Sequence, residues 1–236
     1  MSIFTYHLVK TSFLTALKVY TFPIKAKNIA GLKYVEVMSC MTLGSPVFSP
    51  SRILFNQIAV FAEWESEEDV DKFLKSNSFG KKLSKGWWVY LSLVRHWGKV
   101  TGIDTTINEN IVISLEENET VVAITIAKMK FLEVPRFIHW GKPVEKLVRD
   151  HSGTTLSLAS YKFPNTVSTF SIWKSTKEMT DMVFGHSKMK NPSRHINAMK
   201  ERERKDFHFE FTTLRFKPIA EFGIWKGCEK NYIFKK

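Results

Sequence analysis

Apolar and small residues alternate along two segments of the chain, and each segment ends at a tryptophan. Residues 59–64 (AVFAEW) and 168–173 (STFSIW) both show this pattern. Alternation with a period of two puts every second side chain on one face, which predicts a strand in each segment. A serine follows two residues after each tryptophan, so Ser66 and Ser175 occupy positions suited to helix N-caps.

The residues after each serine predict a helix. Charged residues come first, and apolar residues then recur at helical spacing. These are Val70, Phe73 and Leu74 in the first segment, and Met179, Met182 and Val183 in the second. Both segments have the order strand, cap and helix, which indicates an internal repeat.

Matching elements flank both copies of the repeat. We expect further strands at residues 6–13, 34–43 and 87–94 and a helix at 17–30 in the first copy, and strands at 121–128, 154–161 and 207–216 and a helix at 135–149 in the second. Each copy then has the order β-α-β-β-α-β, which is a ferredoxin-like unit. The predicted fold class is α+β, with two tandem ferredoxin-like repeats.

This repeat divides the chain into an N-terminal half at 1–104, a polar linker at 105–120 and a C-terminal half at 121–236. A ferredoxin-like sheet carries its helices on one face and leaves the other face to be covered. Two such sheets in one chain can cover each other. In one half, the space between sheet and helices can instead open into a pocket.

The composition predicts a folded chain with a large core. Of the 236 residues, 44% are hydrophobic, and 19 Phe and 7 Trp are among them. Cys40 and Cys228 have no metal-binding or redox spacing, so a cytoplasmic location is expected. No run of 18 apolar residues occurs, so no membrane-spanning helix is expected.

The net charge of +12 raises the question of an anionic partner. The basic residues are scattered, and the densest group, at 200–205, is interleaved with Glu201 and Glu203. This favours a solvated helix end over a phosphate-binding stripe, so we expect no nucleic-acid partner. Peripheral contact with an acidic membrane surface, or with an anionic cofactor, fits the charge better.

The seven histidines do not form a recognisable metal motif. The sequence contains no His-Glu-x-x-His pattern, which argues against a classical zinc or non-heme iron site. His186 and His195 differ from the others because both lie in the second long helical region of the C-terminal half. The corresponding residues of the N-terminal half, 77–82, include no histidine.

One of these two histidines could ligate heme, because heme iron needs only one axial imidazole from the protein. Ser193 is a candidate N-cap that would place His195 in the first turn of a helix. Arg194 and Lys188 could pair with the heme propionates.

A series of short motifs follows in a fixed order: 61–66 (FAEWES), 73–74 (FL), 86–89 (GWWV), 95–98 (RHWG), 134–137 (VPRF), 169–175 (TFSIWKS), His195, 214–218 (LRFKP) and 223–227 (GIWKG). Their content and order resemble the spheroidene monooxygenase family, which are heme-containing carotenoid oxygenases. The resemblance covers about residues 55–227, which is most of the chain.

This resemblance implies a dimeric α+β barrel-like architecture, heme b, and insertion of oxygen into an apolar, carotenoid-like substrate. Molecular oxygen and an electron donor would be the other partners. It favours His195 over His186 as the axial ligand of the heme iron, because the family places a histidine in the helix after the Trp-x-Ser motif. Extra residues around 184–194, which include His186, depart from the family's pattern.

Under this hypothesis the heme lies against the C-terminal sheet, and its walls include Phe170, Trp173, Met182 and Phe209. Alternation along 207–216 predicts that Phe209 shares an apolar face with Phe207 and Phe211. Two other functions remain open. One is a heme enzyme with different chemistry, such as dehydration or peroxide-driven oxidation, and the other is a non-catalytic ligand-binding barrel.

Overall fold

The computed structural model describes residues 2–46, 49, 52–103, 115–226 and 231–234. Its first half contains β1 (Ile3–Lys10), α1 (Phe13–Thr21), the 3-10 helix η1 (Ala26–Asn28), β2 (Leu32–Met41), β3 (Ile53–Trp64), α2 (Glu67–Ser76), α3 (Gly80–Leu83) and β4 (Trp87–Lys99). The second half contains β5 (Val121–Met129), the 3-10 helix η2 (Phe131–Glu133), α4 (Val134–Asp150), β6 (Thr154–Lys162), β7 (Thr166–Trp173), α5 (Thr176–Val183), α6 (Arg194–Arg204) and β8 (His208–Phe222).

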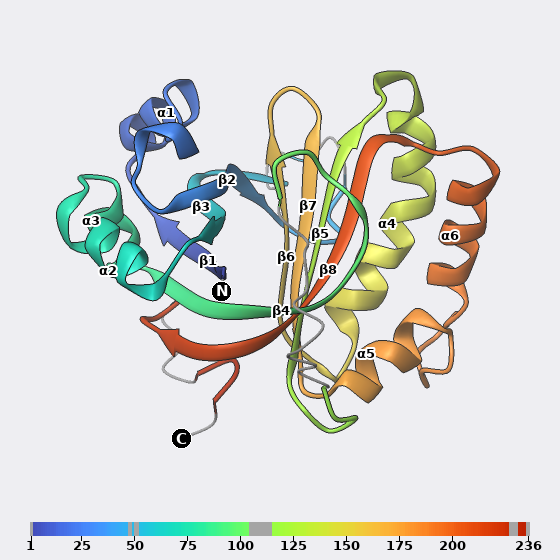
Figure 1. The fold of residues 1–236 in the computed structure, drawn as a ribbon. Helices are drawn as coiled ribbons and strands as arrows, with labels where there is room; N and C mark the ends of the chain where they lie inside the picture. The colour runs from blue at the N-terminus through green and yellow to red at the C-terminus, as the bar shows by residue number, and fades with distance from the viewer. Residues whose placement is uncertain (1, 47–48, 50–51, 104–114, 227–230, 235–236) are drawn as a thin grey trace.

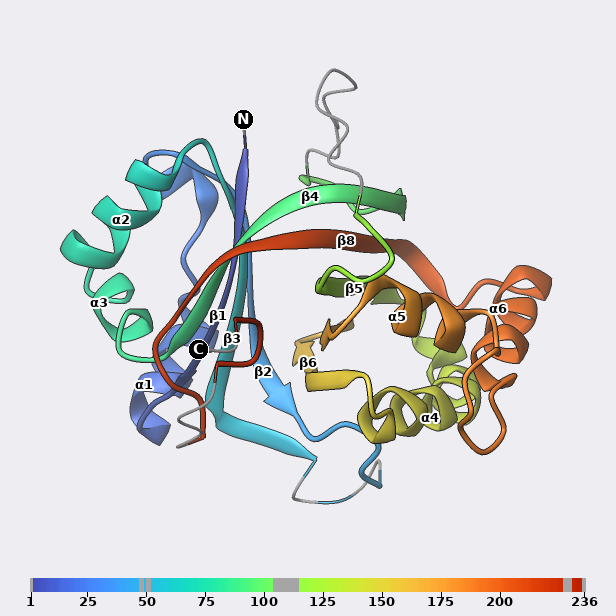
Figure 2. The same ribbon diagram turned by 90° about the horizontal axis from the view of Figure 1, so that it is seen from below.

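The strands form one closed barrel in the order β1-β3-β2-β6-β7-β5-β8-β4. Within each half the order is that of a ferredoxin-like sheet, and the halves join through antiparallel β2–β6 and β4–β8 pairs. Helices α1–α3 flank the N-terminal strands and α4–α6 flank the C-terminal strands (Figures 1 and 2). The predicted α+β class, with tandem ferredoxin-like units in a barrel, is confirmed. Residues 105–114 of the predicted linker lie outside the described residues, and the domain limits stay a prediction.

The inside of the barrel is filled by one apolar core to which both halves contribute. Phe4, Phe61, Phe170 and Phe216 are fully buried there. The ring of Tyr6 stacks on Phe170 with centroids 4.0 Å apart, which joins the two sheets directly. The prediction that the two sheets cover each other is therefore confirmed.

The predicted helix caps after the two repeated tryptophans are present. The Ser66 hydroxyl accepts a hydrogen bond from the backbone N–H of Asp69 at 3.2 Å, and that of Ser175 accepts one from Glu178 at 3.1 Å. Each bond satisfies one of the N–H groups that a helix start leaves unpaired.

Ser66→Ala should lower the free energy of unfolding by about 1 kcal/mol, because the first turn of α2 loses its side-chain acceptor. Urea denaturation measures the change. Ser66→Thr keeps a capping hydroxyl and should stay close to wild type. Equal losses in both variants would contradict the capping role.

Two local expectations were wrong. The first helix spans Phe13–Thr21 rather than 17–30, because Ser12 caps it by accepting from the Thr15 N–H at 3.3 Å. Ser193 precedes α6 as expected, but its backbone is helical and its side chain makes no capping hydrogen bond.

Candidate functional site

The helices of the C-terminal half pack on the sheet at both of its ends and, through Val148 of α4, beside Ala159 of β6. At one end Val121 and Trp173 of the sheet pack with Leu147 of α4 and Met182 of α5. At the other end Ala127 and Met129 pack with Phe137 and Trp140 of α4 and with Phe207. These two apolar clusters are separate from each other.

A strip of small residues crosses the sheet between the two clusters. Strand pairing puts its members on the helix-facing side, in two adjacent rows: Ser157, Ser171 and Ala123 in one row, and Thr169, Thr125 and Thr213 in the next. We call these six residues the small-residue strip. Thr169 is exposed although it lies in the middle of a central strand, and every other member except Ser171 is partly exposed. The helix layer therefore leaves the centre of this sheet accessible.

The N-terminal half carries larger side chains at two of the three equivalent positions in one of these rows. Its row equivalent to Thr169, Thr125 and Thr213 consists of Val60, His7 and Trp88, which pair across β3, β1 and β4. All three are buried, and the His7 ring stacks on Trp88 at 5.6 Å. Burial without a hydrogen-bond partner lowers the pKa of His7 to about 3, so its ring is a neutral packing group. At this row the side chains of the C-terminal copy are therefore smaller at two positions and more exposed at all three than those of the N-terminal copy.

Helix α4 crosses the strip from one apolar cluster to the other. Phe137 and Trp140 belong to one cluster and Leu147 to the second, so Gly141 and Val144 lie between them on the same helix face. A Cβ atom added at Gly141 would meet Phe137 as its nearest neighbour, at an ordinary contact distance of 3.5 Å. Gly141 therefore adds no side-chain bulk to the face of α4 that lies over the small-residue strip.

His195 lies in the first turn of α6, which runs antiparallel beside α4 (Figure 1). Its Nδ1 is 3.0 Å from the carbonyl oxygen of Val183, the last residue of α5. A carbonyl can only accept, so Nδ1 carries the proton and Nε2 keeps its lone pair. Burial lowers the pKa of His195, against the opposing effect of the Val183 hydrogen bond, so the ring is neutral at pH 7. Metal-ligating histidines are typically held in this way.

The other predicted site residues fall into different environments. Trp173 and Met182 lie in the apolar cluster at one end of the strip, while Phe170 faces the barrel interior on the opposite side of the sheet. Arg194 is half-buried beside His195, and His186 is exposed in the loop after α5. Of the predicted walls, therefore, only Trp173 and Met182 border the small-residue strip.

Phe209 does not share a face with Phe207 and Phe211 as the alternation predicted. The β5–β8 register shifts here: Lys128 pairs with Glu210, but Met129 pairs with His208, so Phe209 has no partner on β5. Such a bulge reverses the alternation. Phe209 is 67% exposed, and His208 packs against Phe211 instead. The alternation predicted for Phe209 was wrong for this reason, and its place in a heme wall stays a prediction.

Two arginines that the sequence analysis did not assign to the site lie at the edge of the strip. Arg215 pairs with Ala123 on one side and with Arg95 on the other. Both guanidinium groups stack on Trp97, with Cζ 4.6 Å and 4.5 Å from the ring centroid. Burial, reinforced by Arg95, lowers the pKa of Arg215 to about 10. No carboxylate of the described residues pairs with either arginine, so a bound anion would stabilise the pair.

Comparison with solved structures supports the fold. An aldoxime dehydratase in complex with butyraldoxime is 8% identical, with a TM-score of 0.57, over 93% of this chain and 80% of that chain. A second aldoxime dehydratase, also 8% identical, has a TM-score of 0.53 over 93% and 84%. A ferredoxin-fold protein from Listeria monocytogenes, related to antibiotic biosynthesis monooxygenases, is 12% identical over 93% and 97%, with a TM-score of 0.31.

The likeness to the dehydratases shows a shared fold. No family model matches the sequence, and no curated protein matches it. Within the part of the chain that the structure describes, no helix has the length and apolarity needed to cross a membrane. Across the same residues, no three His, Cys, Asp or Glu side chains gather as a metal-ligand set.

Proposed function

We propose that this chain is a heme-dependent monooxygenase that inserts oxygen into an apolar, carotenoid-like substrate. The observation that carries the proposal is the small-residue strip. Its side chains leave the sheet of the C-terminal half accessible beneath α4, whereas the equivalent His7 and Trp88 of the N-terminal half are buried. A flat apolar cofactor needs such a space between a sheet and a helix layer, and it gains most of its affinity from buried surface.

Residues of α6, of the edge of the strip and of the two apolar clusters fit the parts of heme b. His195 offers a neutral imidazole with a fixed tautomer, which suits an axial ligand of iron. Arg95 and Arg215 are cations without a described carboxylate partner, which suits the propionates. Trp140 and Trp173, in the clusters at opposite ends of the strip, supply apolar walls.

Bound heme would supply oxygen activation, with electrons from a separate donor. The chain's own contribution is to hold and shield the reacting groups. The apolar clusters at the two ends of the strip would favour an apolar substrate over a polar one. The hydroxyls of Thr125 and Thr213, 3.5 Å apart, are polar groups on the strip itself and could orient a substrate oxygen.

The proposal is tested by filling the strip. Thr169 is exposed at the strip's centre, so Thr169→Trp should leave stability nearly unchanged while its indole occupies the space. We expect wild-type protein titrated with hemin to develop a Soret band, and Thr169→Trp to weaken hemin binding by about tenfold or more. Thr169→Val, which keeps the side-chain volume, is the matched control and should bind like wild type.

The heme-loaded protein is then supplied with ¹⁸O₂, a chemical reductant and a soluble polyene. One ¹⁸O atom in the product supports the monooxygenase. The heme-loaded protein could instead incorporate no ¹⁸O but dehydrate an aldoxime or carry out a peroxide-driven oxidation. That result would replace the monooxygenase proposal with a heme enzyme of different chemistry. Absence of heme binding in wild type would reject both and leave a ligand-binding barrel.

A further inference from the structure

A cavity lies beside the strands of the N-terminal half, away from the small-residue strip. It has a volume of about 680 Å³ and is formed by the end of β1, the start of α1, the α3–β4 connection and the segment after β8. We propose that this cavity binds an organic phosphate, with its phosphate groups on lysines and its remaining part against Ile224 and Trp225.

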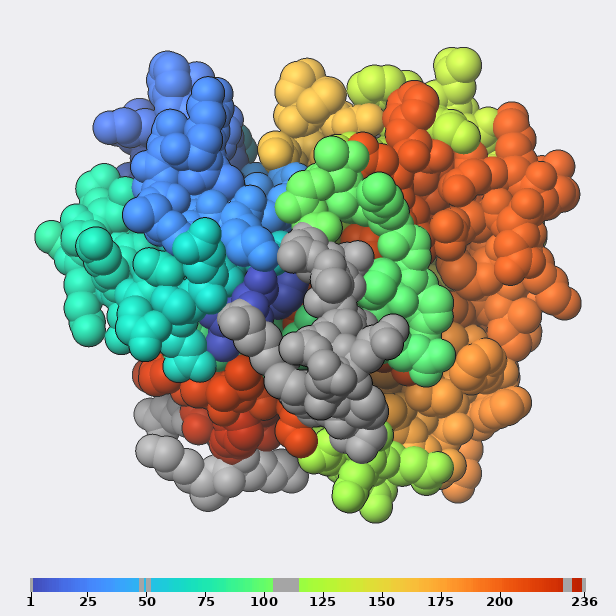
Figure 3. All heavy atoms as spheres, in the orientation of Figure 1, coloured from blue at the N-terminus to red at the C-terminus, as the bar shows by residue number. Residues whose placement is uncertain are grey.

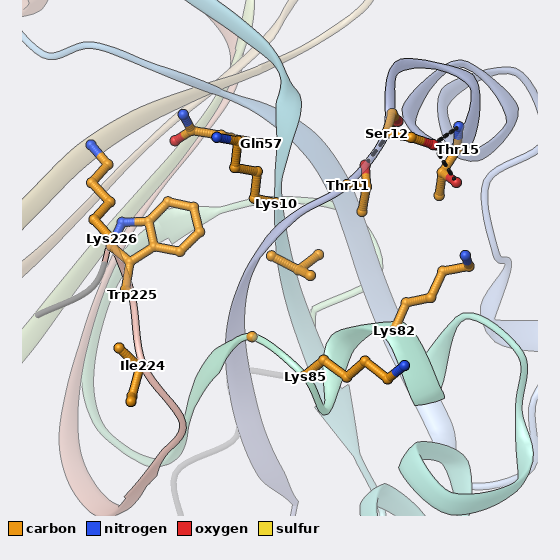
Figure 4. A pocket seen from close by; sticks show the side chains of 12 residues that line it. Lys10, Thr11, Ser12, Thr15, Gln57, Lys82, Lys85, Ile224, Trp225 and Lys226 are labelled. Carbon is orange, nitrogen blue, oxygen red and sulfur yellow. Dashed lines mark hydrogen bonds between the residues drawn. The ribbon is translucent and has the colours of Figure 1, made fainter. Parts of the chain in front are cut away.

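The charge of the cavity is entirely positive. Lys10, Lys82, Lys85 and Lys226 line it, and no acidic residue does. Figure 4 shows Lys82 and Lys85 on the side of α3, and Lys226 across the cavity beside Trp225. None of the four forms an ion pair with a described residue, in contrast to Lys128, Lys162 and Lys217 elsewhere. Four unneutralised ammonium groups around one concavity repel each other, and a polyanion would relieve that repulsion.

Neutral polar groups add to the preference for phosphate. The hydroxyls of Thr11, Ser12 and Thr15 lie at the N-terminal end of α1, which carries no acidic residue in its first turn. The partial positive charge of that helix end therefore adds to the field of the lysines. The Oε1 atom of Gln57, another lining residue, is buried without a hydrogen-bond partner; because it can only accept, it suits a donor on the non-phosphate part of the ligand.

The apolar wall is held in place by two glycines. A Cβ atom at Gly223 would lie 1.9 Å from the carbonyl oxygen of Gly86, and one at Gly86 would lie 2.2 Å from that of Leu8. These close approaches fix the segment after β8 against the α3–β4 connection. They set Ile224, which is 58% exposed, and the buried Trp225 beside the lysines. A ligand with a phosphate end and an apolar end fits this lining.

Calorimetric titration of the full chain with pyrophosphate and with ATP tests the proposal. Wild type should bind both, and Lys82→Ala/Lys85→Ala should weaken binding by about tenfold or more, because two charge-assisted contacts are lost. The matched control is Lys72→Ala/Lys81→Ala, which removes two exposed lysines outside the cavity and gives the same net charge. The control should change affinity less than about twofold.

Three outcomes would overturn the proposal. Equal losses in both double variants would mean that the overall charge of +12 attracts phosphate without a site. No binding of pyrophosphate or ATP by wild type would reject the site. Binding only to vesicles that contain phosphatidylglycerol, and to neither soluble phosphate, would assign the lysines to a membrane surface instead. ATP binding stronger than pyrophosphate binding would support the apolar wall as part of the site.

Discussion

His195→Ala should abolish the Soret spectrum of a histidine-ligated heme and weaken hemin binding by at least about 100-fold. Removal of even an outer-shell partner of a metal ligand costs roughly 10–100-fold in affinity, and this change removes the proposed ligand itself. The half-buried ring has its Nδ1 bound to the Val183 carbonyl, so only Nε2 remains for iron. Hemin titration followed at the Soret wavelength measures both effects.

Two controls separate ligation from structural damage. His186→Ala removes an exposed imidazole from the neighbouring loop and should bind hemin like wild type. Added imidazole should restore the Soret spectrum of His195→Ala, because the space left by the side chain admits it. If His195→Ala keeps wild-type hemin binding while His186→Ala loses it, the assignment of His195 is wrong.

Local pattern predicted the elements of this chain well because their causes are local. Alternation ending at Trp64 and Trp173 identified the strands, and Ser66 and Ser175 identified the caps. Closure of the barrel is different, since it depends on β2 pairing with β6 and β4 with β8 across the two halves. Nothing in a single strand specifies such a partner. The ferredoxin-like order and the family resemblance together made the barrel predictable.

The candidate site was predicted less completely, for two physical reasons. The bulge at Phe209 inserts one residue into β8, and a sequence with regular alternation gives no sign of it. The small-residue strip did leave one signal: the repeat aligns the apolar Val60 with the polar Thr169. The loss of bulk lies at Thr125 and Thr213, which replace His7 and Trp88, and that comparison required the strand register.

Phe170→Ala should lower the free energy of unfolding by about 3–5 kcal/mol, because it opens a cavity in the shared core of the barrel. The ring is 1% exposed, stacks on Tyr6 at 4.0 Å and packs edge-on to Trp87 at 5.9 Å. These contacts join the two halves, so little relaxation can fill the space. Urea denaturation of the protein without heme measures the loss.

Phe209→Ala is the matched control, because it removes the same side chain from an exposed position on β8. It should change stability by less than about 0.5 kcal/mol. Because Phe170 faces the barrel interior and the strip faces α4, Phe170→Ala should also keep its affinity for hemin under conditions where it is folded. A stable Phe170→Ala protein that no longer binds hemin would instead place the cofactor inside the barrel, and the proposed site between sheet and helices would be wrong.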